Sequence, residues 1–168
     1  MPKSLKINLP PTWSDHSAEN PNAPPTYLRD ASDTPGPLQI SWAWYNSGKE
    51  PNPTDQDLID LARAFESRVG GEVLSTACGA CTIGRYGTAV LRAADMTRVQ
   101  VWLLSNGRDF VTVTHINPVE PEADEVAEAQ SIVELLRIEN SDEQPVQTKR
   151  SAGIVSSVRR FLGQNRKR

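Results

Sequence analysis

Alternating apolar and polar residues predict most of the strands in this chain. The clearest alternation spans residues 38–45 and places four apolar side chains on one face: Leu38, Ile40, Trp42 and Trp44. A shorter alternation spans residues 5–9. Two further segments have strand composition with glycines as interruptions: residues 72–77 and 82–93, with Gly79 and Gly84. A period of two is typical of extended chain. Residues 14–37 are polar and rich in proline, so we expect a surface excursion with at most one brief strand.

A hairpin is predicted at Asn106-Gly107, because both central residues of a type I′ turn need a positive φ. A two-residue turn would place Leu103 opposite Phe110 and Arg98 opposite His115. One face of this hairpin then carries Val99, Val101, Leu103 and Phe110, and the other carries Trp102, Leu104, Val111 and Val113. Both faces are apolar, which favours a sheet covered on both sides.

Two segments have helical periodicity. Residues 54–69 begin at Thr54, a good N-cap, and end before Gly70. Residues 122–138 begin with acidic residues that include Glu125, and they carry one apolar stripe: Val126, Ala129, Val133 and Leu136. Acidic residues favour the start of a helix because they complement the helix dipole. We expect both helices to pack on the sheet, with Phe65 and Leu136 among the most buried side chains.

The order of these elements resembles the PsbP-like, Mog-type αβα sandwich, a group that includes DcrB-like bacterial proteins and small chaperones of type VI secretion effectors. The resemblance rests on three stretches and covers roughly residues 5–138: Leu9-Pro10-Pro11-Thr12-Trp13, Phe110-Val111-Thr112-Val113-Thr114 and Ile132-Val133-Leu135-Leu136. It implies an α+β fold, an antiparallel sheet covered by two helices. It also implies a binding module or assembly factor more than an enzyme.

Charge divides the chain into an acidic body and a basic tail. Residues 144–168 hold seven basic residues and no acidic one, whereas residues 1–143 carry a net charge of about −10. We therefore expect a single domain over residues 1–140 and a flexible, disordered basic tail over residues 141–168. Arg159, Arg160 and Phe161 would bind an acidic protein surface or an anionic membrane. Nucleic acid is a poor fit, because the body is acidic and the tail has one aromatic residue.

Cys78 and Cys81 form the C-x-x-C pattern, which carries a chemical interpretation. Such a pair can act as a thiol oxidoreductase when a helix start lowers the pKa of the first thiol. Here the following residues have strand and turn composition, so a structural role for two small thiols is favoured. His16 and His115 lack the spacing of metal ligands, and His115 is expected to be a half-exposed sheet residue. We predict no metal site and no cofactor.

Two aromatic residues near turns, Trp13 and Tyr45, are candidates for lining a partner-binding groove. The first thirteen residues contain no apolar signal region and the cysteine spacing does not suggest a disulfide framework, so a cytoplasmic location is expected. No nucleophile, base and orienting group converge in the sequence. We predict a non-catalytic protein-binding domain, an adaptor or chaperone-like protein; the alternative is a thiol oxidoreductase. Exposed residues at a sheet edge could pair subunits.

Overall fold

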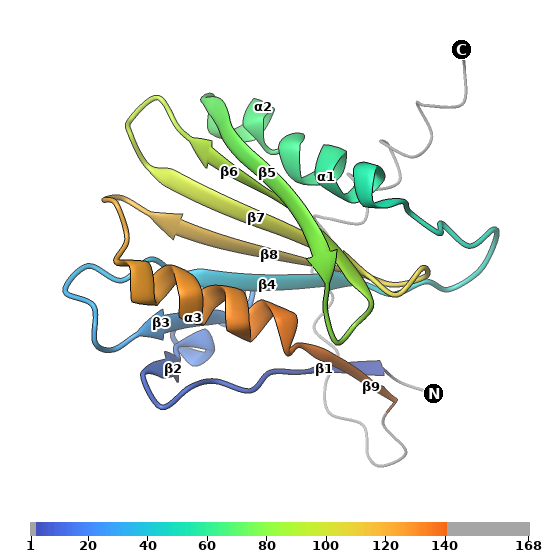
Figure 1. Ribbon diagram of the computed structural model, residues 1–168. Coiled ribbons are helices and arrows are strands. Elements are labelled where there is room, and N and C mark those ends of the chain that lie inside the picture. The colour runs from blue at the N-terminus through green and yellow to red at the C-terminus, as the bar shows by residue number, and fades with distance from the viewer. Residues whose placement is uncertain (1–2, 141–168) are drawn as a thin grey trace.

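The computed structural model describes residues 3–140, which form a mixed α+β fold around one large antiparallel sheet (Figure 1). From one edge to the other, its seven strands are β2 (Trp13–Asp15), β3 (Thr26–Arg29), β4 (Leu38–Ala43), β8 (Phe110–Asn117), β7 (Arg98–Ser105), β6 (Arg85–Arg92) and β5 (Glu72–Ala80). A separate two-stranded sheet pairs β1 (Lys3–Lys6) with β9 (Arg137–Asn140). The helices are α1 (Asp55–Arg63), α2 (Glu66–Val69), α3 (Ala123–Glu134) and the short 3₁₀ helix η1 (Ser17–Glu19).

One face of the sheet packs against α1. The helix begins with a capping box, in which Thr54 and Asp57 each accept a backbone hydrogen bond from the other. Its buried residues, Leu58, Leu61 and Ala62, contact strand residues that point to this face: Ala89, Leu91, Val99, Val101, Leu103 and Phe110. The N-cap and the apolar period thus position the helix as the sequence predicts.

Gly87 on β6 allows α1 to approach the sheet closely. A Cβ atom at this position would lie 2.4 Å from the backbone nitrogen of Ile59 and 2.5 Å from the carbonyl carbon of Leu58. Backbone cannot yield as a side chain can, so this contact requires glycine.

The predicted helix at residues 54–69 is divided into α1 and α2. At the division the N–H of Phe65 bonds to the carbonyl of Ala62, only three residues earlier, which tightens the turn. Phe65 is therefore only half-buried, and its ring lies 4.9 Å from the Arg68 guanidinium. The expectation that Phe65 is among the most buried residues is wrong. Gly70 ends the segment in the left-handed conformation, at φ 65°, as predicted.

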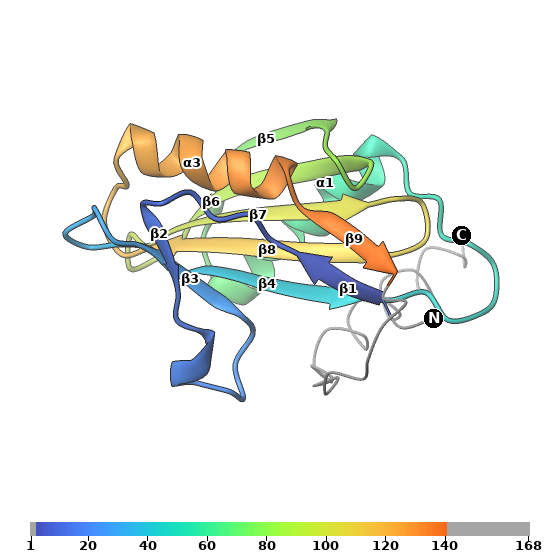
Figure 2. The same cartoon turned by 90° about the horizontal axis from the view of Figure 1, so that it is seen from below.

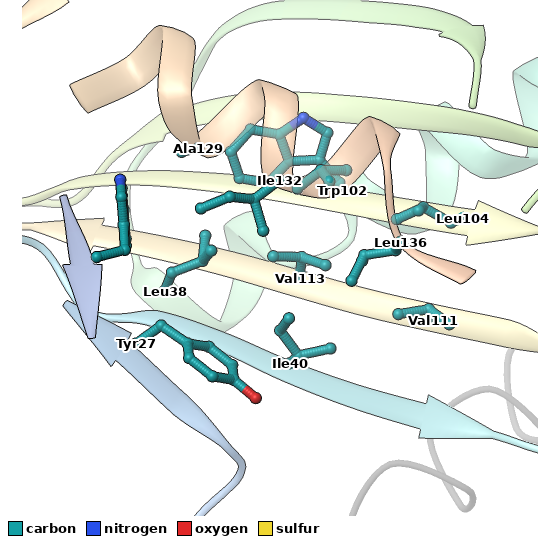
Figure 3. Packing of buried hydrophobic residues seen from close by; sticks show 12 residues of the cluster. Tyr27, Leu38, Ile40, Trp102, Leu104, Val111, Val113, Ala129, Ile132 and Leu136 are labelled. Atoms are coloured by element: carbon teal, nitrogen blue, oxygen red, sulfur yellow. The ribbon is translucent and has the colours of Figure 1, made fainter. Parts of the chain in front are cut away.

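The other face of the sheet packs against α3 (Figure 3). Buried strand residues on this face include Leu38, Ile40, Trp102, Leu104, Val111 and Val113, and α3 and the residues after it contribute Ala129, Ile132, Val133 and Leu136. Trp102 and Val111 are fully buried, and Trp102 donates its indole N–H to Gln130 Oε1 at 2.8 Å. The expectation from the two apolar hairpin faces is confirmed, as is the burial of Leu136.

The second helix is shorter than predicted. α3 ends at Glu134, and the residues expected to finish it instead form β9, where Ile138 pairs with Leu5 of β1. The first strand, expected at residues 5–9, lies at Lys3–Lys6. Residues 137 and 138 pair with β1, which is far away in the sequence, and so do not continue the helix. In both views β1 and β9 lie side by side beyond the end of α3 (Figures 1 and 2).

The hairpin between β7 and β8 has a four-residue loop, so the predicted two-residue turn is wrong. Ser105 pairs with Phe110, and the side-chain oxygen of Asn106 accepts the N–H groups of Arg108 and Asp109. This local turn adds Arg108 and Asp109 to the C-terminal side of the predicted loop. The register therefore shifts by two, and every side chain stays on its predicted face.

The excursion at residues 14–37 adds two short strands to the sheet, not one. β2 and β3 pair with each other, and β3 pairs with β4. The segment between β2 and β3, which carries η1, projects away from the sheet (Figure 2).

Candidate functional site

β5 forms one edge of the seven-stranded sheet (Figure 1). Seven of its nine residues are exposed and none is buried, whereas seven of the eight residues of β7 are buried. No residue between Glu72 and Arg85 carries a charge. Long, uncharged and exposed edges present backbone groups that another strand can pair with, and natural proteins usually block them.

The other edge of the sheet, β2, is protected. It is three residues long and ends at the charged Asp15, and short charged edges resist strand addition. β5 has one protective feature, a bulge between Val73 and Ser75 that disturbs its start. The regular and unprotected part of the edge is therefore Ser75–Ala80.

The backbone direction of this edge follows from the turn after it. Cys81 and Gly84 exchange both of their backbone hydrogen bonds. Hydrogen-bonded and non-hydrogen-bonded pairs alternate along an antiparallel ladder. The β5–β6 pairs alternate in this way back from Cys81 and Gly84, so Gly79 and Ala77 point their N–H and C=O groups toward β6. The residues between and beside them, Thr76, Cys78 and Ala80, point theirs outward.

The side chains of Ser75–Ala80 are all small, so a second backbone could approach closely. The prediction that Gly79 interrupts the strand is wrong. Gly79 pairs with Tyr86, whose ring occupies the space above it. A Cβ on Gly79 would lie 2.8 Å from the Tyr86 hydroxyl. That hydroxyl accepts a hydrogen bond from Gln130 of α3 at 3.0 Å. The glycine thus serves cross-strand packing in a continuous strand.

Cys78 and Cys81 are free and lie on opposite faces of the sheet. Cys78 is exposed and pairs with Gly87, where α1 approaches, whereas Cys81 is half-buried against the cluster on the α3 side. Residues three apart on extended chain point to opposite faces. Burial raises the pKa of the Cys81 thiol, which favours its less nucleophilic protonated form. No three potential metal ligands gather within residues 3–140.

Trp13 and Tyr45 lie at opposite ends of β4 and do not share a groove. Trp13 is 5% exposed, and its ring lies 6.1 Å from that of His115, which pairs with the first residue of β4. Tyr45 follows the other end of β4, is half-buried, and lies 5.0 Å from the Arg108 guanidinium. A binding role for either residue stays a prediction. Arg159, Arg160 and Phe161 lie outside the described residues.

A buried polar cluster around Glu125 was not predicted from the sequence. His115 is fully buried, not half-exposed, and opposite it on β7 lies Gln100, not Arg98. The carboxylate of Glu125 accepts four hydrogen bonds, from His115 Nε2 at 2.9 Å, Asn117 Nδ2 at 2.9 Å, Ser32 Oγ at 2.7 Å and the N–H of Gly36 at 3.1 Å. One signal was present: Glu125 falls at helical spacing on the buried stripe of α3, four residues before Ala129.

The charge states in this cluster follow from its geometry. Burial lowers the pKa of His115, so the imidazole is neutral and Nε2 carries the proton that Glu125 accepts. Burial would raise the pKa of Glu125, but the hydrogen bonds from Ser32, Gly36, Asn117 and His115 outweigh it and lower the pKa. The cluster therefore joins a neutral imidazole to an ionised carboxylate.

A second set of contacts joins α3 to the excursion. Arg29 is buried and donates to Glu128 Oε2 at 3.0 Å and to Glu122 Oε2 at 2.9 Å. Glu128 also accepts the indole N–H of Trp13 at 2.8 Å. These contacts and the Glu125 cluster bind residues 12–36 to the body, which is a structural role. They leave the β5 edge as the candidate functional site.

None of the helices in the described part of the chain has the length and apolar character needed to span a membrane.

Comparison with known proteins identifies the fold. No protein-family model and no curated protein matches the chain. The solution structure of cyanobacterial PsbP (CyanoP) from Synechocystis sp. PCC 6803 is similar to it, with a TM-score of 0.52 and 12% identity over 82% of this chain and 92% of that chain. A crystal structure from Bacteroides thetaiotaomicron VPI-5482 is similar with a TM-score of 0.43 and 15% identity, over 98% of this chain and 59% of that chain.

The likeness to CyanoP shows a PsbP-like fold, as the element order predicts, and at 12% identity it shows the fold alone. The narrower resemblance to DcrB-like proteins and type VI effector chaperones stays a prediction.

Proposed function

We propose that this protein is a non-catalytic protein-binding domain, adaptor or chaperone-like in role, that takes an extended segment of another polypeptide as an added strand along β5. The observation that carries the proposal is the outward direction of the backbone groups of Thr76, Cys78 and Ala80 on an uncharged, exposed edge. Each of these residues offers one N–H and one C=O. In strand addition such groups supply affinity, and neighbouring side chains supply specificity.

The fold likeness is consistent with this role but does not carry it, because one fold serves many functions. A cytoplasmic location belongs to the same proposal. The exposed free thiol of Cys78 suits a reducing compartment, in which thiols stay reduced.

The alternative function, thiol oxidoreductase, is not favoured. Closing a disulfide between Cys78 and Cys81 would require two side chains on opposite faces of a strand to meet. The resolving thiol would also be the half-buried Cys81, whose pKa burial raises. An insulin-reduction assay tests this alternative directly, and dithiol turnover that is lost in Cys78→Ser would restore it.

The binding proposal is tested with a random library of twelve-residue peptides selected on the full chain. We expect selected peptides to bind wild type and Cys78→Ala equally and to lose at least tenfold in affinity on Cys78→Pro. Proline removes an outward N–H and leaves the β5–β6 ladder intact, since that N–H does not face β6. Alanine is the matched control, because it removes the thiol and keeps the N–H. Peptides that bind Cys78→Pro as well as wild type would overturn the proposal.

A further inference from the structure

We propose that a second copy of this chain occupies the β5 edge, so that two β5 strands pair antiparallel and join two sheets into one. This inference rests on the proposed function, since it names the polypeptide that adds to β5. It is carried by the register of the outward backbone groups and by the neutrality of the edge.

The outward groups are self-complementary about Cys78. If Cys78 pairs with Cys78 of the second copy, Thr76 of each copy lies opposite Ala80 of the other. All three outward residues of each strand are then hydrogen-bonded pairs. A register centred on Ala77 would instead place Ala80 opposite Leu74, inside the bulge. The first register is therefore favoured, and it has the closed two-fold symmetry typical of homodimers.

Nothing in Ser75–Ala80 opposes this pairing. The segment has no charge, so the two paired strands add no charge repulsion of their own. The two-fold axis is perpendicular to the sheet, which keeps both α1 helices on one face of the joined sheet. Thr76 and Cys78 lie on that face, and Ala77 and Gly79 lie on the other. All are small, so the backbones can reach the usual spacing of about 4.8 Å between strands.

This arrangement gives Cys78 a specific neighbour. The Cα atoms of a hydrogen-bonded antiparallel pair lie about 5.5 Å apart, so the two Cys78 thiols lie across the symmetry axis. Cys81 follows the end of the paired segment and is half-buried. A short reagent with two maleimide groups, each of which adds to one thiol, should join two copies through Cys78.

The experiment is sedimentation equilibrium of the full chain over a range of concentrations, with cross-linking by bismaleimidoethane. We expect a dimer for wild type and for Cys78→Ala, and at least a tenfold higher dissociation constant for Cys78→Pro. Ala80→Pro removes another outward N–H, near the strand end, and should also raise the dissociation constant. It replaces Cys78→Pro in the test if that variant does not fold. Cross-linking should be lost in Cys78→Ser and kept in Cys81→Ser.

A wild-type chain that stays monomeric at all concentrations would overturn the dimer, as would a dimer that tolerates both proline variants. Failure of this inference is distinguishable from failure of the proposed function. If the chain is a monomer and peptide binding still depends on the N–H of Cys78, the homodimer is rejected and the proposal that β5 binds an added strand is retained. If the chain dimerises through β5 and no peptide binds this edge, the homodimer is supported and binding of a different polypeptide is rejected.

Discussion

Glu125 accepts hydrogen bonds from two separate parts of the chain: Ser32 and Gly36 before β4, and His115 and Asn117 on β8. A buried carboxylate is costly unless its oxygens are satisfied, and here four donors satisfy them. The excursion at residues 14–37 thus packs on α3 through polar contacts. Its composition alone suggested a surface loop.

The stability of the protein should fall in two steps as the pH decreases. The pKa of His115 is lowered in the folded state, so between that value and about 6.5 only the unfolded chain binds the proton. The free energy of unfolding should decrease below pH 6.5, with a slope of at most about 1.4 kcal/mol per pH unit. Glu125, whose pKa is also lowered, contributes stability above about pH 4.3 that is lost on further acidification.

Urea unfolding at a series of pH values measures both steps. His115→Gln should remove the decrease that begins near pH 6.5 and keep the one at lower pH. His16→Gln is the control, because His16 lies on the excursion beside the exposed Glu19, outside the cluster. A wild-type profile that stays flat from pH 7 to pH 5 would show that burial of His115 does not determine its protonation.

The burial of Glu125 and His115 was the hardest feature to predict, because charged and polar side chains are usually exposed. An acidic residue in the first turn of a helix is usually explained by the helix dipole, which hides the fact that Glu125 also lies on the buried stripe. His115 continued the apolar alternation of Val111 and Val113, but its polar side chain suggested exposure at a strand end. Both are buried, and a hydrogen bond of 2.9 Å joins them.

At the scale of elements, the close contact between α1 and β6 gives a direct test. Gly87→Ala should destabilise the fold by about 3 kcal/mol, since the new Cβ meets the backbone of Leu58 and Ile59. Gly79→Ala is the matched control on the neighbouring strand. Its Cβ meets the end of the Tyr86 side chain, which can move, so about 1 kcal/mol is expected. Thermal and urea unfolding should show a larger loss of stability for Gly87→Ala than for Gly79→Ala. Equal losses of stability would contradict the close approach of α1 to β6 at Gly87.

Periodicity predicted which elements form, and local contacts determined where they end. The period of two placed every β7 and β8 side chain on its correct face, because a register error of two residues preserves the faces. The loop length could not be predicted, since it depends on the side-chain oxygen of Asn106. The end of α3 depends on β1, which lies more than a hundred residues earlier.

At the scale of the whole molecule, the described residues that build the core clusters on the two sheet faces lie within 5–136. We therefore expect the free energy of unfolding of a chain that ends at residue 140 to differ from that of the full chain by no more than about 1 kcal/mol. The seven basic residues of 144–168 should matter for binding instead. The 168-residue chain should bind vesicles that contain phosphatidylserine at low salt and lose this binding at high salt, as exposed charges are screened within about 8 Å at physiological ionic strength.

Vesicle co-sedimentation of the two chains measures this difference, and vesicles of neutral phosphatidylcholine are the control. Equal binding by both chains at low salt would show that the basic segment is not the membrane-binding element. Loss of the fold on truncation would show instead that the segment stabilises the domain.

The candidate site could be predicted only in part at this scale. The sequence shows that residues 73–84 lack charge, but an uncharged strand can equally be central and buried. Only the strand order reveals that β5 is an edge. The thiol pair was visible in the sequence, and its division between two faces required the strand to continue through Gly79.

The pairing of β1 with β9 has a mechanical consequence. Lys3 lies opposite Asn140 and Lys6 lies opposite Arg137, so the two ends of the described domain leave this small sheet at the same side. A pulling force applied at residues 3 and 140 would load the hydrogen bonds one pair at a time, as a zip opens, and would not shear them together. The domain should therefore begin to yield at low force at β1 and β9 while the seven-stranded sheet remains intact.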